Sequence, residues 1–158
     1  MAHINQRRTE NISGNFYVDS TCIDCDTCRW MAPEVFGQAG EQSAVYHQPT
    51  NETEEMRSLA ALLSCPTSSI GTVDKPKNIK EVQQNLPALV TENIYHCGYH
   101  SEKSYGAASY LIVRPEGNIL VDFPRYVPPL VKNIEAMDGI RYLYLTHRQD
   151  VAYSQKYH

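Results

Sequence analysis

The chain has 158 residues, which is enough for one ordinary domain or two small ones. Its composition, 42% hydrophobic and 20% charged, is typical of a globular protein and excludes general disorder. No run reaches the roughly eighteen apolar residues of a membrane span, and the N-terminus lacks the apolar segment of a signal peptide. We therefore expect a cytoplasmic, reducing compartment, where five cysteines favour metal binding over disulfides.

The net charge of −4 is unevenly distributed. Residues 1–85 carry seven Lys/Arg and eleven Asp/Glu, whereas residues 86–158 carry seven of each. An acidic surface of this kind would associate with basic docking surfaces on partner proteins, although a purely solubilising role is an equal alternative. The sequence has no basic patch of the kind that nucleic-acid binding requires.

A short β-prone run at residues 16–19 leads directly into a group of cysteines. Cys22, Cys25 and Cys28 are each separated by two residues, and Cys65 follows at a distance, with a proline after it. Four thiolates at this spacing can hold a cubane iron–sulfur cluster. Tetrahedral zinc is the main competitor, although structural zinc usually uses two Cys-x-x-Cys pairs. A thiol redox motif is a further alternative.

Between the third and fourth of these cysteines, the sequence predicts two extended segments and then a helix. Residues 34–36 and 44–46 can extend, with glycines between them. Residues 50–55 offer capping side chains and first-turn acids. Apolar residues then recur at helical spacing, so the helix should present Cys65 at its C-terminal end. These apolar residues are Met56, Leu59, Ala60 and Leu63.

The residues that flank the cysteines carry a resemblance to a known family. Arg-Trp-Met-Ala-Pro-Glu-Val-Phe at residues 29–36 and Ala-Leu-Leu-Ser-Cys-Pro-Thr-Ser-Ser-Ile at residues 61–70 resemble the single-cluster 4Fe-4S ferredoxins, over roughly residues 12–75. The resemblance implies a ferredoxin domain at residues 1–76, a 4Fe-4S cluster and one-electron transfer. The implied ligands are Cys22, Cys25, Cys28 and Cys65, within an apolar shell of Ile23, Val35, Phe36 and Ile70.

The rest of the chain has a different pattern. Residues 77–88 predict a linker helix that ends at a proline, and residues 89–158 then form a second domain. The predicted elements are strands at residues 93–96, 109–113 and 118–122, a helix that begins at Pro128-Pro129, and a strand at residues 140–146.

The second domain resembles the N-terminal portion of the metallo-β-lactamase superfamily, because a strand ending in Asp122 is followed by a helix and then by a strand ending in Thr-His147. Fusions of a ferredoxin with this fold are known in photosynthetic organisms. The resemblance therefore implies an α+β chain that ends in half of a layered α/β fold, in a cyanobacterial cytosol or plastid stroma.

The metal signature of that superfamily, Thr-His-x-His-x-Asp-His, is degenerate in this chain. Only His147 is in register, because Gln149, Val151 and Ala152 stand at the other ligand positions. The family also needs about as much sequence again for its second half. We therefore expect the fold without the hydrolase chemistry, and no enzyme activity. His147 and Asp150 remain as a candidate second metal site, with His96, His100 and His158 as possible helpers.

A half domain of this kind would expose an apolar face, which predicts a homodimer through the second domain. The alternative is that the ferredoxin part covers the face. The residues expected on this apolar face of the second domain are Leu111, Val113, Leu120, Leu143 and Leu145.

The whole sequence predicts an electron carrier whose second domain serves dimerisation or docking. A metal-dependent hydrolase or oxidoreductase and a cluster-based redox or oxygen sensor are the alternatives. Cys97 is expected to be a small buried residue, with a redox thiol, an intermolecular bridge or an extra ligand as alternatives.

Overall fold

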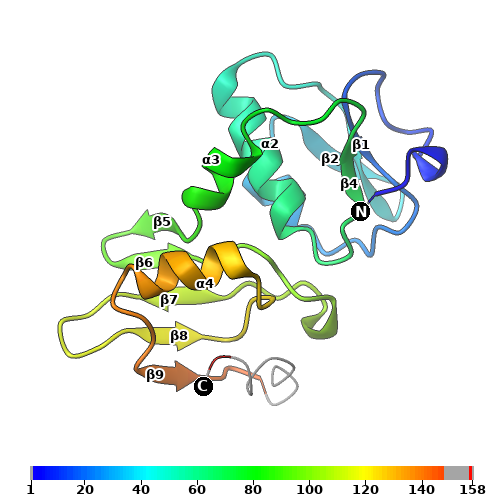
Figure 1. The fold of residues 1–158 in the computed structure, drawn as a ribbon. Helices are drawn as coiled ribbons and strands as arrows, with labels where there is room; N and C mark the ends of the chain where they lie inside the picture. Colours follow the sequence, from blue (N-terminus) through cyan, green and yellow to red (C-terminus); the bar gives the residue numbers. More distant parts are fainter. Residues whose placement is uncertain (1, 148–156, 158) are drawn as a thin grey trace. The chain divides into compact units, whose positions relative to one another are not determined.

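The computed structural model describes residues 2–147 and 157 of the protein, and its fold mixes helices and strands as an α+β protein does (Figure 1). The chain divides into two compact units, residues 1–82 and 83–158. No helix in the described part of the chain is long and apolar enough to cross a membrane.

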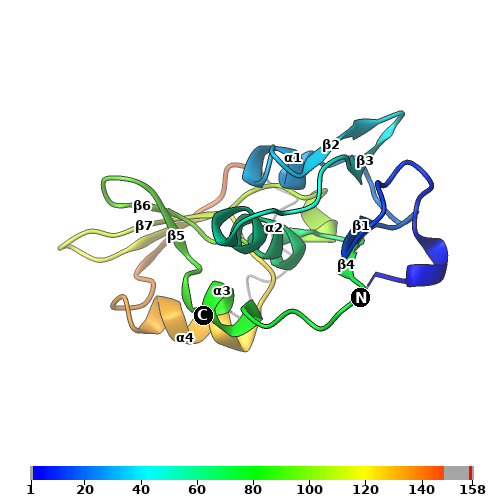
Figure 2. The ribbon, with the colours of Figure 1, turned by 90° about the horizontal axis from the view of Figure 1, so that it is seen from above.

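The first unit contains two small antiparallel sheets and two α-helices (Figures 1 and 2). One sheet joins β1 to β4, so that residues near the two ends of the unit pair side by side, and the other is the β2–β3 hairpin. The helices are η1 (Ile4–Gln6), α1 (Thr27–Met31) and α2 (Glu52–Ser64), and the strands are β1 (Phe16–Val18), β2 (Phe36–Ala39), β3 (Gln42–Val45) and β4 (Ile70–Thr72).

Helix α2 begins and ends as its sequence dictates. The Asn51 side chain accepts a hydrogen bond from the Glu54 N–H (3.0 Å), and the Glu54 carboxylate accepts one from the Thr50 N–H (2.8 Å). This reciprocal arrangement satisfies N–H groups that the first helical turn leaves without a partner. At the other end the Cys65 N–H donates to the Ala61 carbonyl, and the following proline cannot continue the helix. Cys65 is therefore presented at a defined helix end.

The sequence did not predict α1 or β4. Helix α1 has five residues, which is too short for a helical pattern to be visible before the proline at position 33. Strand β4 begins at Ile70 and contains a glycine, and its pairing with β1 comes from a contact between distant parts of the chain. Helix α1 contains Cys28 and β4 follows Cys65, and both elements depend on packing rather than on local propensity.

The second unit is built on one five-stranded sheet. Neighbouring strands are antiparallel, except that β8 and β9 are parallel and are connected through α4, which lies along one face of the sheet (Figures 1 and 2). The elements are β5 (Ala88–Thr91), β6 (Ile94–His96), η2 (Glu102–Ser104), β7 (Tyr110–Ile112), β8 (Ile119–Val121), α4 (Pro128–Glu135) and β9 (Tyr142–Tyr144). Helix α3 (Ile79–Gln84) spans the division between the units, where a linker helix was predicted, whereas β5 was not predicted.

The expected open apolar face of the second unit is only partly open. Leu111 and Leu120 lie directly opposite each other in register and are fully buried, so they already belong to the core of the chain. Leu143, the next residue in the same row, is 38% exposed because β9 is at the edge of the sheet among the described strands. The exposed apolar surface is therefore smaller than predicted and is concentrated on β9.

Candidate metal centre

The cysteine loop, residues 22–28, curls because two of its aspartates adopt left-handed backbone conformations. Asp24 has φ of +57° and Asp26 has φ of +65°, a region in which aspartate is tolerated better than most residues. Arg29 stabilises both turns, since its guanidinium pairs with Asp24 (2.6 Å) and with Asp26. The loop therefore bends back on itself between successive cysteines.

Four cysteines from this loop and from the end of α2 line a single cavity. Cys22 and Cys25 lie on the loop and are half-buried, Cys28 lies on α1, and Cys65 caps α2. Cys28 and Cys65 are buried and belong to the apolar core of the unit. The remaining lining residues are Val18, Ile23, Thr27, Ser43, Thr67, Ser69 and Ile70.

Polar groups lie beside the Cys25 and Cys65 sulfur atoms. The Cys25 thiol donates to the Thr27 hydroxyl over 3.4 Å, and the Thr27 backbone makes a further hydrogen bond that lowers the pKa of this thiol. The Ser69 N–H donates to the Cys65 sulfur over 3.2 Å, and the Ser43 side chain lines the same cavity. Donors of this kind stabilise negative charge on thiolate ligands.

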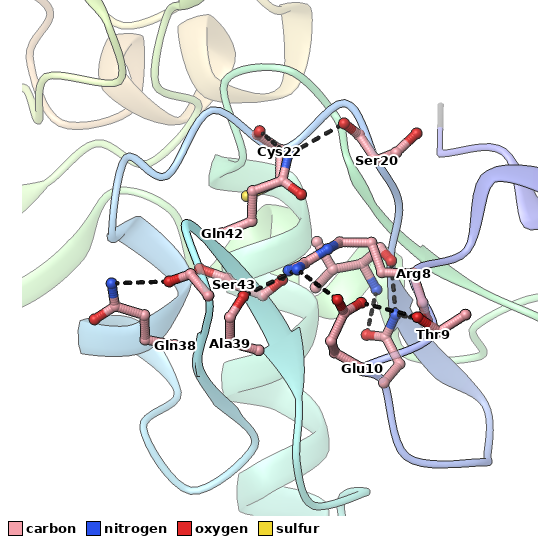
Figure 3. Close-up of polar contacts among 12 residues, drawn as sticks. Arg8, Thr9, Glu10, Ser20, Cys22, Gln38, Ala39, Gln42 and Ser43 are labelled. Atoms are coloured by element: carbon pink, nitrogen blue, oxygen red, sulfur yellow. Dashed lines mark hydrogen bonds and ion pairs between the residues drawn. The ribbon is translucent and has the colours of Figure 1, made fainter.

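The β2–β3 hairpin holds the cysteine loop in place (Figure 3). The Gln42 side-chain amide donates to the carbonyl of Cys22 (2.6 Å) and to that of Ser20 (3.2 Å). On the same strand the Ser43 carbonyl accepts a hydrogen bond from the Arg8 guanidinium (2.6 Å). Strand β3 therefore fixes the backbone at the first cysteine and contributes Ser43 to the lining of the cavity.

Burial makes the charged form of these thiols unfavourable. It raises the pKa of Cys28 to about 12, and the effect of the nearby Ser43 side chain offsets only part of this rise. Burial also raises the pKa of Cys25 above its ordinary value. Thiolates in this cavity therefore need a positively charged occupant, and metal binding would release their protons.

The donor set fits an iron–sulfur cluster. Four soft sulfur ligands within an apolar wall, with nearby N–H and O–H donors, are the features through which a protein holds and tunes such a cluster. Within residues 2–147 and 157, no group of three or more His, Cys, Asp or Glu side chains is arranged to hold a single metal ion. In a cubane cluster each cysteine binds a different iron, so its ligands do not meet at one point.

The predicted apolar shell divides into two parts. Val35 and Phe36 are buried in the core, and Ile70 is buried and lines the cavity. Ile23 also lines the cavity but is 42% exposed. Sequence reasoning missed the polar residues of the site; Thr27 and Ser69, two and four residues after a cysteine, could have been found from spacing.

The candidate second site in the other unit is only partly within the described residues, because Asp150 lies outside them. His147 is exposed and lines a cavity of about 330 Å³ beside Asp122. Both Asp122 oxygens accept hydrogen bonds from Thr146, one from its N–H (2.8 Å) and one from its hydroxyl (2.5 Å). Asp122 therefore acts as the turn acceptor that its position at a strand end suggests.

His96 and His100 form a buried pair with each other. Neither lines the cavity to which His147 belongs. The remaining candidate, His158, lies outside the described residues. The Nε2 atoms of His96 and His100 are 2.7 Å apart, and the His100 Nδ1 is 2.7 Å from the Gly106 carbonyl oxygen. Since a carbonyl only accepts, His100 carries its proton on Nδ1, and His96 donates from Nε2. Both rings are neutral in this arrangement.

Cys97 follows His96 directly in the sequence and is fully buried. Burial raises the pKa of its thiol to about 12. A protonated, inaccessible thiol is a poor nucleophile, and its surroundings are those of a small core residue.

Comparison with known proteins identifies the part of the chain that contains the clustered cysteines. Residues 18–72 match the family model described as the 4Fe-4S single cluster domain of ferredoxin I. No curated protein and no solved structure matches the chain. The matched segment runs from β1 to β4 and includes the cysteine loop, the β2–β3 hairpin and α2. Residues 18–72 therefore constitute a single-cluster ferredoxin domain, and the cofactor of the protein is a 4Fe-4S cluster.

Proposed function

We propose that the protein transfers single electrons through a 4Fe-4S cluster bound by Cys22, Cys25, Cys28 and Cys65. One observation carries the proposal: these four side chains, from a loop and a distant helix end, line the same cavity within the segment that matches the ferredoxin family. When bound, the cluster supplies one-electron chemistry without a protein acid or base.

The residues of the chain bind the cluster and control its surroundings. The four thiolates would bind the iron, and backbone donors on Thr27 and Ser69 lie beside two of them. Apolar side chains on β1 and β4 limit the access of water to the buried side of the cavity. The half-buried cysteines of the loop leave the other side close to the surface, where a partner could exchange an electron.

The surface beside the cysteine loop suits a redox partner. Ile23 lines the cavity and is 42% exposed, so an apolar contact is available next to it. The acidic surplus of residues 1–85 favours a partner with a basic docking surface. The rate of electron transfer to such a partner should therefore fall as salt is added, and a rate that rises or stays constant would contradict this charge pairing.

For the second unit we infer half of a lactamase-type layered fold that serves dimerisation or docking. The parallel pair β8 and β9, connected through α4, supports the fold assignment. The edge strand β9 supports the interface, because Leu143 and Tyr144 are 38% and 62% exposed. Light scattering should give the mass of a dimer, which Tyr144→Lys should reduce to that of a monomer. A monomeric wild-type protein would exclude the homodimer.

A second candidate function comes from the cavity beside His147. A cavity of about 330 Å³ lies at the ends of two parallel strands, which is where α/β sheets commonly bind ligands. A metal-dependent hydrolase or oxidoreductase would need a further metal there. Zinc, manganese or iron in excess of the cluster iron would favour this candidate.

The decisive experiment is spectroscopic. The protein would be purified anaerobically, rebuilt with iron and sulfide if needed, and examined by visible absorption and by electron paramagnetic resonance before and after dithionite. We expect about four iron and four sulfide per chain and a signal that appears on one-electron reduction. Colourless protein without inorganic sulfide after rebuilding would refute the proposed function.

A further inference from the structure

The N-terminal segment, residues 2–15, lies before β1 and before the matched ferredoxin residues, which begin at residue 18. Side-chain hydrogen bonds attach it to the first unit. The Asn11 carbonyl oxygen accepts hydrogen bonds from the N–H groups of Val18 on β1 (2.9 Å) and of Val45 on β3 (3.0 Å). Its amide nitrogen donates to the Val18 carbonyl (2.8 Å). One side chain of the N-terminal segment therefore joins β1 to β3.

Arg8, in the same segment, holds both strands of the β2–β3 hairpin (Figure 3). Its guanidinium donates to the carbonyls of Ser43 on β3 (2.6 Å) and of Ala39 on β2 (2.9 Å). The Arg8 side chain is only 8% exposed, and a buried guanidinium needs acceptors, which these carbonyls and the Glu10 carboxylate (3.4 Å) supply. A two-stranded hairpin is marginally stable by itself, so Arg8 acts as a clamp on its position.

The hairpin in turn holds the first cysteine of the loop. The Gln42 side-chain amide donates to the carbonyls of Cys22 (2.6 Å) and Ser20 (3.2 Å). Carbonyls only accept, so both bonds require the amide nitrogen, and this fixes the orientation of the amide. Gln42 directly precedes Ser43, whose carbonyl Arg8 binds. A continuous set of hydrogen bonds therefore runs from Arg8 through β3 to the backbone of Cys22.

We propose that Arg8 is a positioning residue for the cluster: it clamps the β2–β3 hairpin, which allows Gln42 to hold the backbone of Cys22 at the cavity. This inference rests on the proposed function and assigns a role in it to a residue outside the matched segment. Groups that orient a ligand keep its sulfur in place and limit local opening that would expose the iron. Release of the clamp should distort the site and accelerate the loss of iron.

Arg8→Gln removes the guanidinium and should release the cluster faster. With a chelator under anaerobic conditions, the rate at which visible absorption bleaches should rise by about tenfold, the order expected when a hydrogen bond from a charged group is lost. Amide exchange should accelerate in the hairpin and at residues 20–25, whereas α2 should keep its protection. Equal acceleration in α2 would mean that the whole unit is destabilised and would overturn the proposal.

The matched control is Arg7→Gln, which removes the same charge from the adjacent position. The Arg7 guanidinium donates to the carbonyls of Ile12 (2.6 Å) and Gly14 (3.1 Å) and lies over the Tyr17 ring, so these contacts lie within residues 12–17. This variant should release its cluster within about twofold of the wild-type rate. Equal acceleration in Arg7→Gln and Arg8→Gln would mean that charge or attachment of the segment matters instead of the clamp, and it would overturn the proposal.

The electron paramagnetic resonance signal of the reduced cluster separates positioning of a ligand from general support of the fold. Its shape follows the geometry of the cluster and its ligands, so it should change in Arg8→Gln and in Gln42→Ala but not in Arg7→Gln. A signal that is unchanged in Arg8→Gln would overturn the positioning role.

Gln42→Ala also tests the route from Arg8 to the loop. In the Gln42→Ala background, Arg8→Gln should raise the release rate by a smaller factor than in the wild-type background, because residues that act through one another are not independent. Equal factors in both backgrounds would overturn the route through the hairpin.

If Arg8→Gln binds no cluster, Arg8→Lys and Arg7→Lys decide. A lysine ammonium lacks the planar fork of donors with which arginine binds two carbonyls at once. Arg8→Lys should therefore lose its cluster faster than Arg7→Lys, and equal rates in the two variants would overturn the proposal.

Failure of this inference is distinguishable from failure of the proposed function. A wild-type protein that binds no cluster would refute the function before any variant is compared. A wild-type protein with a normal cluster and an Arg8→Gln variant that releases it at the wild-type rate would refute only the role of Arg8.

Discussion

The two units of the molecule have similar lengths but different kinds of core. In the first unit the buried cluster of apolar residues includes Cys28 and Cys65, with Cys22 packed against it, so the metal ligands are part of the core. In the second unit the buried residues include Leu111, Leu120 and Phe123, and the buried polar residues include the neutral histidine pair. The first core requires a cofactor to be complete, whereas the second is closed by its own side chains.

This difference has a thermodynamic consequence. Metal binding and folding are coupled wherever the ligands are part of the structure, so the stability of the first unit should depend on iron. The stability of the second unit should depend on packing and on keeping two imidazole rings uncharged. The experiments below test this contrast, beginning with the largest expected effect.

Removal of one cysteine from each unit should have opposite outcomes for the cluster. Cys65→Ala removes the ligand at the end of α2 and should abolish the bound iron, sulfide and visible absorption. Cys97→Ala is the matched control, because Cys97 is also buried but lies in the second unit, and it should retain the full cluster. Loss of the cluster in both variants would refute the contrast.

Removal of the iron should loosen only the first unit. After treatment with a chelator, amide hydrogen exchange should accelerate in β1, β4 and α2, because the four thiols lose the occupant that joins them. Amides in β7 and β8 should keep their protection. Equal loss of protection in both sheets would mean that the second unit also depends on the cluster.

Truncation of a core side chain should destabilise the second unit strongly. Leu120→Ala removes a fully buried side chain and should cost about 2–5 kcal/mol, measured as the free energy of opening from amide exchange in β7 and β8. Leu89→Ala, at an exposed position of β5, should change it by less than ~0.5 kcal/mol. Neither variant should alter the absorption of the cluster.

Mild acid should destabilise the second unit. Burial lowers the pKa of His96 and His100 to about 4, with repulsion from His100 acting further on His96 and the charge of Arg125 acting on His100. An unfolded histidine titrates near ~6.5, so between pH 6.5 and pH 4 the unfolded chain binds more protons and stability falls as the pH falls. The loss should be on the order of 3 kcal/mol for one ring, and stability should level off below pH 4.

Variants of single histidines would assign this pH dependence. His96→Gln removes one buried ring and should flatten the decline measured by amide exchange in β6 and β7. His47→Gln changes an exposed histidine of the first unit and should leave the decline unchanged. A decline that persists in full after His96→Gln would contradict the role of the pair.

The sequence was sufficient to predict the elements that local chemistry determines. The spacing of Cys22, Cys25 and Cys28 identified the cofactor class, and the match to the ferredoxin family over residues 18–72 confirms the 4Fe-4S cluster. Helix α2 was predictable because Asn51 caps it and Leu59 lies on a regular apolar face. Strands β6 to β9 and helix α4 of the second unit were predictable in the same way, from branched residues and from the paired prolines at the start of α4.

The features that the sequence did not predict depend on contacts that local sequence patterns do not show. Ser43 gives no local indication that it will line the cysteine cavity, because only the folded hairpin brings it there. His96 and His100 are four residues apart in a segment that is not helical, so helical periodicity could not pair them. The partly closed apolar face was missed for the same reason, since burial of Leu111 and Leu120 depends on what covers the sheet.

The β2–β3 hairpin has its turn at the surface and contacts the cysteine loop through the residue that follows the turn. Its turn contains Gly40, which has φ of +65° and open space around it, and the exposed Glu41. At its other side Gln42 holds the backbone of Cys22. A fluorophore attached at position 41 through Glu41→Cys would therefore lie close to the iron without replacing a ligand, and quenching of its emission would report the loading of single molecules in real time.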